Sequence, residues 1–201
     1  MKMTSLDRAL ILLMGLLAAY QIVVGIDNMD NLPILAYTIA FGVLLVAGLL
    51  LVILGFDALD SPVVVTVSTI IPLALATGLV IQHLASLRTP YLVFAIIGFA
   101  AVIFTRSIQT RSKLPVITIA IVHGVAGLTI FLLPILTSIR GETHPLFGLV
   151  GLGGALIGIG GLLLSFLKTG KPILSRETIL SVLPTLFLLM TVCFVAGFKY
   201  G

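Results

Sequence analysis

Seven long apolar runs, separated by short polar breaks, constrain this chain more than any other feature of its sequence. The runs cover about residues 9–26, 32–55, 62–86, 91–106, 114–138, 145–167 and 177–198. A helix that crosses the hydrocarbon core of a bilayer needs about 20 mostly apolar residues. The pattern therefore predicts an all-α integral membrane protein with about seven transmembrane helices, in which residues 1–201 form a single domain. The fourth run is the shortest, so the predicted topology depends most on its span.

The composition excludes an ordinary soluble domain. Of the 201 residues, 60% are hydrophobic and 9% are charged, whereas a soluble domain is about 25% charged. A soluble fold of this length could not hide so much apolar surface from water. The net charge of +4 comes from residues in the polar breaks and at the two ends of the sequence, where basic residues are typical of orientation in a membrane. We therefore expect the chain to contact membrane lipid and to bind no nucleic acid.

The distribution of lysine and arginine predicts the orientation. If the N-terminus is cytoplasmic, the inside segments hold eight of these residues and the outside segments hold three. Cytoplasmic loops of membrane proteins carry an excess of Lys and Arg. We therefore predict a multi-pass protein of the plasma or inner cell membrane, with its N-terminus in the cytoplasm and its C-terminus outside.

An internal repeat is visible when the sequence is shifted by 112 residues. The shift aligns five pairs of identical residues: Gly15 with Gly127, Pro33 with Pro145, Gly42 with Gly154, Gly48 with Gly160, and Pro72 with Pro184. Glycine and proline mark special backbone positions, so these coincidences favour two related halves. We predict parallel halves at about 6–87 and 118–198, joined by a linker helix at about 91–106.

This 3+1+3 arrangement resembles the layout of the SWEET sugar transporters, which are built from parallel repeats. The resemblance is one of layout only, because the sequence contains no tryptophan and no proline–glutamine motif of the kind those carriers have. The aromatic fraction of 7% is also low for a site that stacks sugars.

The apolar run at 145–167 is rich in glycine. Gly154 and Gly158 form a GxxxG pair, and Gly153 and Gly161 extend the small-residue face. Such faces let helix backbones approach closely, so that van der Waals contact drives association. We predict that this face packs tightly against another helix of the bundle. Close approach to a flat cofactor or to a partner subunit is the alternative.

Three prolines lie inside apolar runs: Pro72, Pro134 and Pro184. Each removes a backbone hydrogen bond and is expected to kink its helix. Ser and Thr side chains near Pro72 and Pro184 can satisfy the carbonyl groups that the prolines leave without a partner. The kinks are either static features of the bundle or hinges of the kind that transporters use.

The three histidines are the main candidates for a ligand site. His123 lies near the expected bilayer midplane, whereas His83 and His144 lie near the predicted outer face. Ionisable residues in a membrane are functional candidates, and a neutral imidazole can bind haem iron or another metal. We predict His83 and His144 as the ligands of a b-type haem, with His123 as a further candidate. The alternative is that His83 and His144 simply lie at the membrane interface.

No sequence motif indicates catalysis. The chain has one cysteine, Cys193, and contains no HExxH, EF-hand or Cys/His zinc spacing. No nucleophile–base pair is visible, so we expect no catalytic activity of its own. The leading interpretation is a multi-pass subunit of a larger energy-transducing or electron-transfer assembly, with other membrane subunits or further copies as partners. The alternative is a small-solute or ion transporter built from two three-helix repeats.

Overall fold

The computed structural model describes residues 2–26, 30–108, 113–168 and 174–201, except for the side chains of residues 165, 166 and 168. The described residues form eight α-helices: α1 (Ser5–Val24), α2 (Asn31–Leu54), α3 (Pro62–Ser68), α4 (Ile70–His83), α5 (Arg88–Ser107), α6 (Leu114–Ile139), α7 (Gly148–Lys168) and α8 (Arg176–Phe198). Three short 3-10 helices connect them: η1 (Gly55–Asp60), η2 (Ala85–Leu87) and η3 (Pro145–Phe147).

Each apolar run of the sequence forms helix. Seven helical stretches are long and apolar enough to cross a membrane, and the fourth spans Ala85–Ser107. The predicted all-helical class is therefore confirmed, and the shortest run is extended by polar residues at both of its ends. The described residues contain no strand.

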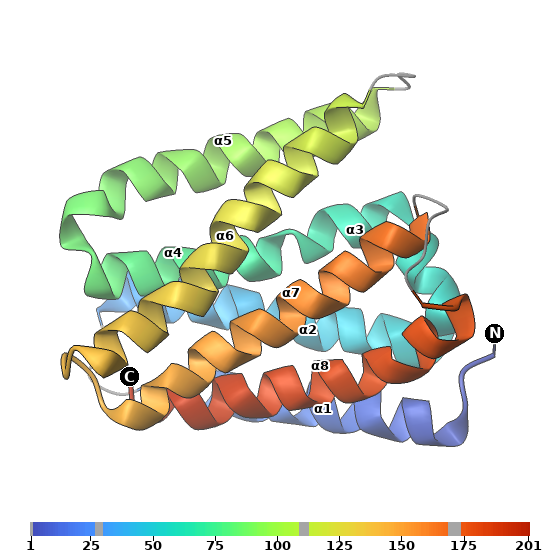
Figure 1. The fold of residues 1–201 in the computed structure, drawn as a ribbon, viewed down its shortest axis with the longest axis horizontal. Coiled ribbons are helices and arrows are strands. Elements are labelled where there is room, and N and C mark those ends of the chain that lie inside the picture. Colours follow the sequence, from blue (N-terminus) through green and yellow to red (C-terminus); the bar gives the residue numbers. More distant parts are fainter. Residues whose placement is uncertain (1, 27–29, 109–112, 169–173) are drawn as a thin grey trace.

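Successive long helices alternate in direction, so the bundle has two ends (Figure 1). We call the end that carries the N-terminus the N-end. It also holds the last residues of α2, α5 and α7 and the first residues of α3, α6 and α8. The opposite end carries the C-terminus, and we call it the C-end.

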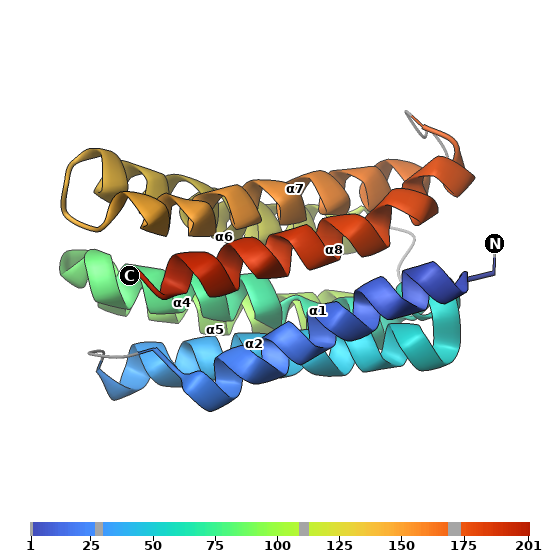
Figure 2. The same ribbon diagram turned by 90° about the horizontal axis from the view of Figure 1, so that it is seen from below.

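Six of the long helical stretches form a closed ring among the described residues. Around the ring, α1 contacts α2, α2 contacts α4, α4 contacts α6, α6 contacts α7, α7 contacts α8, and α8 contacts α1. Helix α5 lies outside this ring, against α4 and α6 (Figures 1 and 2). Only Gly98 and Val102 of α5 are buried, so most of this helix faces outward.

The helix boundaries follow local capping chemistry. Thr4 and Asp7 form a capping box at the start of α1, with the Thr4 hydroxyl accepting from the Asp7 N–H at 3.1 Å. Helices α1 and α2 end at Gly25 and Gly55, both with φ of +71°. Glycine adopts this left-handed backbone region without the steric cost that a Cβ brings.

Pro72 explains why the third span is divided into α3 and α4. Proline has no N–H, and its ring clashes with the carbonyl four residues earlier, which belongs to Ser68. The α-helix is interrupted directly after Ser68, at Thr69. The Thr69 hydroxyl donates to the carbonyl oxygen of Val65 at 3.1 Å, which satisfies a backbone acceptor on the N-end side of the break.

Pro134 and Pro184 are buried inside helices that continue through them, α6 and α8. Near Pro134, the Thr137 hydroxyl lies 3.1 Å from the carbonyl oxygens of both Leu133 and Pro134. The three prolines therefore differ in effect, because only the first coincides with a break in its span.

Candidate functional site

The C-end of the ring is closed by aromatic side chains from both halves of the chain. The Phe198 ring of α8 is the centre of this group, which we call the C-end cluster. Its centroid lies 4.5 Å from Tyr37, 6.1 Å from Phe41, 6.3 Å from Phe147 and 6.4 Å from Phe194. All five side chains are at most 2% exposed. Because α2 contributes to one side and η3 with α8 to the other, the cluster joins the two halves.

Polar groups of the first half border the C-end cluster. The Tyr37 hydroxyl donates to Oε1 of Gln82 at 3.1 Å, which connects α2 to α4. The next residue, His83, places its ring 5.1 Å from the Phe147 ring. Its Nε2 atom is buried and has no hydrogen-bond partner among the described residues.

His144 makes different contacts at the same end of the bundle. Its exposed ring stacks on Tyr200, with centroids 4.8 Å apart. Its Nδ1 accepts a hydrogen bond from the N–H of Leu146 at 3.2 Å, which caps η3. In a neutral imidazole that accepts at Nδ1, the proton is on Nε2, so Nε2 has no lone pair for a metal.

The structure thus brings His83 and His144 to one end of the bundle without joining them in one site. A haem between them needs two facing imidazoles with free nitrogens. Here the fully buried Phe147 ring lies against His83, and His144 caps a helix. This arrangement does not fit a bis-histidine haem. No group of three or more His, Cys, Asp or Glu residues in the described part of the chain could hold a metal ion.

His123 lies in a second polar region, between α5 and α6. We call this region the α5–α6 polar set, and it consists of Arg106 and His123. Tyr91 lies in the first turn of α5, at the opposite end of that helix, where it is near Thr129 of α6. The Nε atom of Arg106 is buried and has no hydrogen-bond partner among the described residues. The His123 ring lies near the backbone of Ile119, one turn earlier in α6. The guanidinium of Arg106 is close enough to act electrostatically on the His123 ring.

The helices of this region approach closely at one point. A Cβ added to Gly98 of α5 would lie 3.1 Å from Cγ2 of Val122 on α6, which places Gly98 opposite the residue before His123. Gly98 therefore lets the linker helix lie against α6 at the level of the histidine.

The glycine face of α7 divides into two parts. Gly153 and Gly154 lie at close helix contacts, as expected of a packing face. A Cβ on Gly153 would be 2.6 Å from the Phe194 ring, and one on Gly154 would be 2.8 Å from Cγ2 of Ile130. Both distances are shorter than real Cβ contacts, so a side chain at either position would force its neighbours to shift.

Gly158 and Gly161 meet nothing within 4 Å of an added Cβ among the described residues. Gly124 and Gly127 of α6 are equally open. On each helix the two open glycines lie N-endward of the Gly154–Ile130 contact. In Figure 1 the two helices diverge toward the N-end, and we call this open region the glycine wedge.

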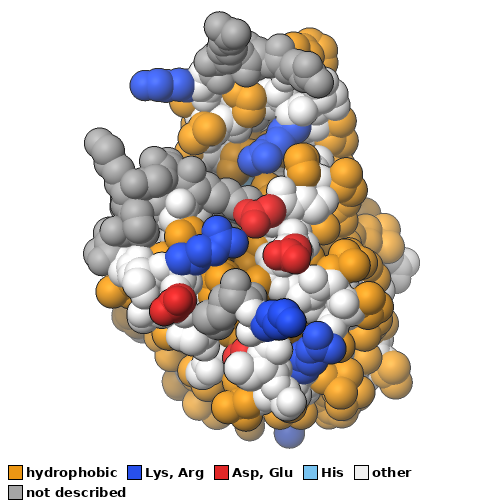
Figure 3. Space-filling view, turned by 90° about the vertical axis from the view of Figure 1, so that its right-hand side faces the viewer, with side chains coloured by type: hydrophobic (Ala, Val, Ile, Leu, Met, Phe, Trp, Pro, Cys, Tyr) orange, Lys and Arg blue, Asp and Glu red, His pale blue; other side chains and the backbone are white. Residues whose placement is uncertain are grey.

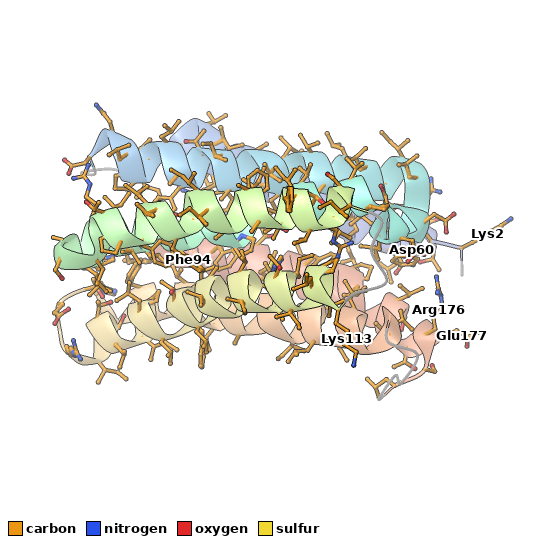
Figure 4. The ribbon with its side chains drawn as sticks, turned by 90° about the horizontal axis from the view of Figure 1, so that it is seen from above. Lys2, Asp60, Phe94, Lys113, Arg176 and Glu177 are labelled. Carbon is orange, nitrogen blue, oxygen red and sulfur yellow. The ribbon has the colours of Figure 1, made fainter. Side chains whose placement is uncertain are left out.

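The N-end carries exposed charges of both signs among hydrophobic side chains (Figure 3). Asp60 of η1 and Arg176 of α8 form an ion pair with a distance of 3.6 Å between Oδ2 and Nη2 (Figure 4). This pair connects the two halves at the N-end, as the C-end cluster does at the other. Both side chains are more than half exposed, so the pair contributes little to stability.

Comparison with protein-family models, curated proteins and solved structures finds no match for this chain.

Sequence reasoning missed the C-end cluster and the Tyr37–Gln82 hydrogen bond. An available signal was the pair Phe194 and Phe198, which are four residues apart and share a helix face. The residues that meet them come from distant parts of the chain, so spacing alone does not reveal the cluster.

Proposed function

We propose that this protein is a membrane transporter for a small uncharged solute, built from two three-helix halves. The halves are α1–α4 and α6–α8, and α5 links them. The proposal rests chiefly on the order of helices around the ring.

The ring order is the one expected of two parallel repeats related by a two-fold axis. Within each half, the first span contacts the second and the second contacts the third. Between the halves, the third span of each contacts the first span of the other, through α4 with α6 and α8 with α1. Transporters with parallel repeats move one repeat against the other around a site between them.

The prolines support the same interpretation. Pro72 and Pro184 lie at similar places in the third spans of the two halves. Pro72 comes ten residues after the first residue of its span, Pro62, and Pro184 comes eight residues after the first residue of its span, Arg176. The third spans make both contacts between the halves, so a bend in either one changes how the halves meet. Hinges in such places absorb the backbone change of a rocking motion.

The interior favours an uncharged solute. Among the described side chains, the buried polar residues apart from Asp7 in the α1 cap are neutral: Gln21, Thr69, Thr77, Thr137 and Thr191. Transfer of an unpaired charge into such surroundings would cost far more than transfer of a neutral group. A neutral solute can instead exchange hydrogen bonds with hydroxyl and amide groups of the kind that Tyr37 and Gln82 offer.

Solute permeability of proteoliposomes tests this function. Vesicles with and without the protein are placed in hyperosmotic urea, glycerol, erythritol or xylitol, and reswelling is followed by light scattering. A transporter makes reswelling faster for at least one of these solutes. A reversible cross-link between the halves should then slow it.

The cross-link is designed at the ion pair of the N-end. Asp60→Cys and Arg176→Cys are combined in a Cys193→Ser background and bridged by a short bifunctional methanethiosulfonate reagent. Dithiothreitol should restore the rate, and the single Asp60→Cys variant treated in the same way is the control. Reswelling equal to that of empty vesicles for every solute would contradict the proposal.

A second function is supported by the glycine wedge. Four open glycines on two diverging helices, Gly124, Gly127, Gly158 and Gly161, fit the close approach of a further transmembrane helix. This observation favours a subunit of a larger membrane assembly. Leucine in place of Gly158 would then separate the chain from its partner without unfolding it. Gel filtration of the gently solubilised variant tests this, and an unchanged assembly would contradict it.

We also propose that the N-end of the bundle faces the cytoplasm. Among the described side chains, the N-end holds Lys2, Arg8, Arg106, Lys113 and Arg176, and the C-end holds Arg88, Arg140 and Lys199. This excess of cations supports a cytoplasmic N-end in the plasma or inner cell membrane.

A further inference from the structure

Arg106 stands out because it is a cation in a membrane helix without a charged partner in the described part of the chain. It lies in the last turn of α5, and its Nε atom is buried without a hydrogen-bond partner there. Neither ion pair of the described residues includes it, since these join Arg140 to Glu142 and Arg176 to Asp60. Arg106 as a whole is half-buried, so its charge is only partly removed from solvent. Partial burial of a charge without a partner is still unfavourable, and more so in a bilayer.

The neighbouring helices cannot supply the missing anion. The elements that pack against α5 are α3, α4, α6 and η2, and none of them contains an aspartate or glutamate. His123 is the titratable residue of α6 that interacts electrostatically with Arg106, and an imidazole does not become negatively charged in the accessible pH range. The hydroxyls of Thr105 and Ser107, beside Arg106, donate to carbonyl oxygens of their own helix. The anion must therefore come from outside these helices.

The surroundings of Arg106 indicate what carries that anion. Ile103 and Phe104, on the preceding turn, are 43% and 66% exposed. These residues face hydrocarbon if α5 spans the membrane, and Arg106 lies one residue before the end of the helix. An arginine at this depth reaches the level of the lipid headgroups, because its long apolar stem lets the guanidinium extend toward the interface. Its fork of N–H donors matches the geometry of a phosphate.

We propose that Arg106 binds the phosphate of an anionic phospholipid in the leaflet at the N-end. The lipid phosphate supplies the counter-charge that the chain lacks, and its acyl chains lie along the exposed apolar residues of α5. This lipid site does not depend on solute transport, so a failure of the transport proposal would leave it unaffected.

The test measures binding of phosphatidylglycerol to the full-length protein by native mass spectrometry from detergent micelles. Phosphatidylcholine with the same acyl chains is the reference lipid. We expect the wild-type protein to keep phosphatidylglycerol in preference to phosphatidylcholine. Arg106→Gln should weaken binding of phosphatidylglycerol at least about tenfold, which is the effect of losing one charge-assisted hydrogen bond.

Arg88→Gln is the matched control, because Arg88 is an exposed arginine at the opposite end of the same helix. It should bind phosphatidylglycerol as the wild-type protein does. Arg106→Lys keeps the charge and loses the fork, so it should retain part of the preference, and it replaces Arg106→Gln if that variant fails to fold.

Three results would overturn the proposal. The first is an undiminished preference for phosphatidylglycerol in Arg106→Gln, and the second is an affinity of Arg106→Lys equal to that of the wild type. The third is a preference that glycerol 3-phosphate removes at millimolar concentration, which would identify a soluble phosphate as the ligand.

Discussion

Alanine substitutions at Gly154 and Gly158 should change stability in opposite directions, although the two residues form one GxxxG pair. At Gly154 a Cβ would lie 2.8 Å from Cγ2 of Ile130 and 3.0 Å from the backbone C of Ile130 and N of Phe131. Backbone atoms cannot move aside cheaply, so α6 and α7 must separate. At Gly158 no atom lies within 4 Å of the added methyl group.

The magnitudes follow from these distances. Overpacking lowers the free energy of unfolding by about 1–3 kcal/mol. Replacing a glycine inside a helix by alanine raises it by about 1 kcal/mol, because alanine has the higher helix propensity. Gly154→Ala should therefore destabilise by about 0–2 kcal/mol. Gly158→Ala should stabilise by about 0.5–1 kcal/mol, because the backbone gain is not offset by a clash.

The assay is reversible unfolding of the monomer by SDS in mixed micelles, followed by circular dichroism. The free energies of unfolding of the two variants should differ by about 0.5–3 kcal/mol. Equal free energies, or a larger loss for Gly158→Ala, would show that α6 and α7 do not diverge as described. A loss at Gly158 seen only in the assembled protein would identify the wedge as a subunit contact.

Three further predictions concern the topology, the histidines and the cap of α1. In a cysteine-free background, a cysteine at Asp30 should react with a membrane-impermeant maleimide from outside intact cells, and one at Lys113 only after permeabilisation; the reverse pattern would invert the topology. The purified protein from a haem-replete host should show no Soret band, and a band lost in both His83→Ala and His144→Ala would contradict this. Thr4→Ala removes the α1 cap and should lower the free energy of unfolding by about 0.5–2 kcal/mol in the same SDS titration; an unchanged value would show that the cap is not formed.

The positions of the helices could be predicted from the sequence, whereas their neighbours could not. Apolar length alone identifies each span, because a bilayer requires about 20 such residues. Nothing in that pattern tells which helices touch, so the ring and the outside position of α5 came from the structure. The internal repeat suggests related halves but does not say how they meet.

The candidate site shows the same limit in individual residues. Counting residues along the predicted spans places His83 and His144 at the same end of the bundle, and in the structure both lie at the C-end. Their side-chain partners, Phe147 and Tyr200, depend on lateral packing that residue counting does not describe. Likewise Gly154 and Gly158 are equivalent by spacing, and only the angle between α6 and α7 distinguishes them.

Distance measurements between the halves in lipid nanodiscs test the central claim most directly. Spin labels at Ser86 and Glu142 report on the C-end, and labels at Asp57 and Glu177 report on the N-end, with all four positions exposed. If two three-helix halves rock against each other, double electron–electron resonance should show two distance populations at each end. A condition that lengthens the C-end distance should shorten the N-end distance. One narrow, unchanging population at both ends would contradict the account and leave a rigid bundle.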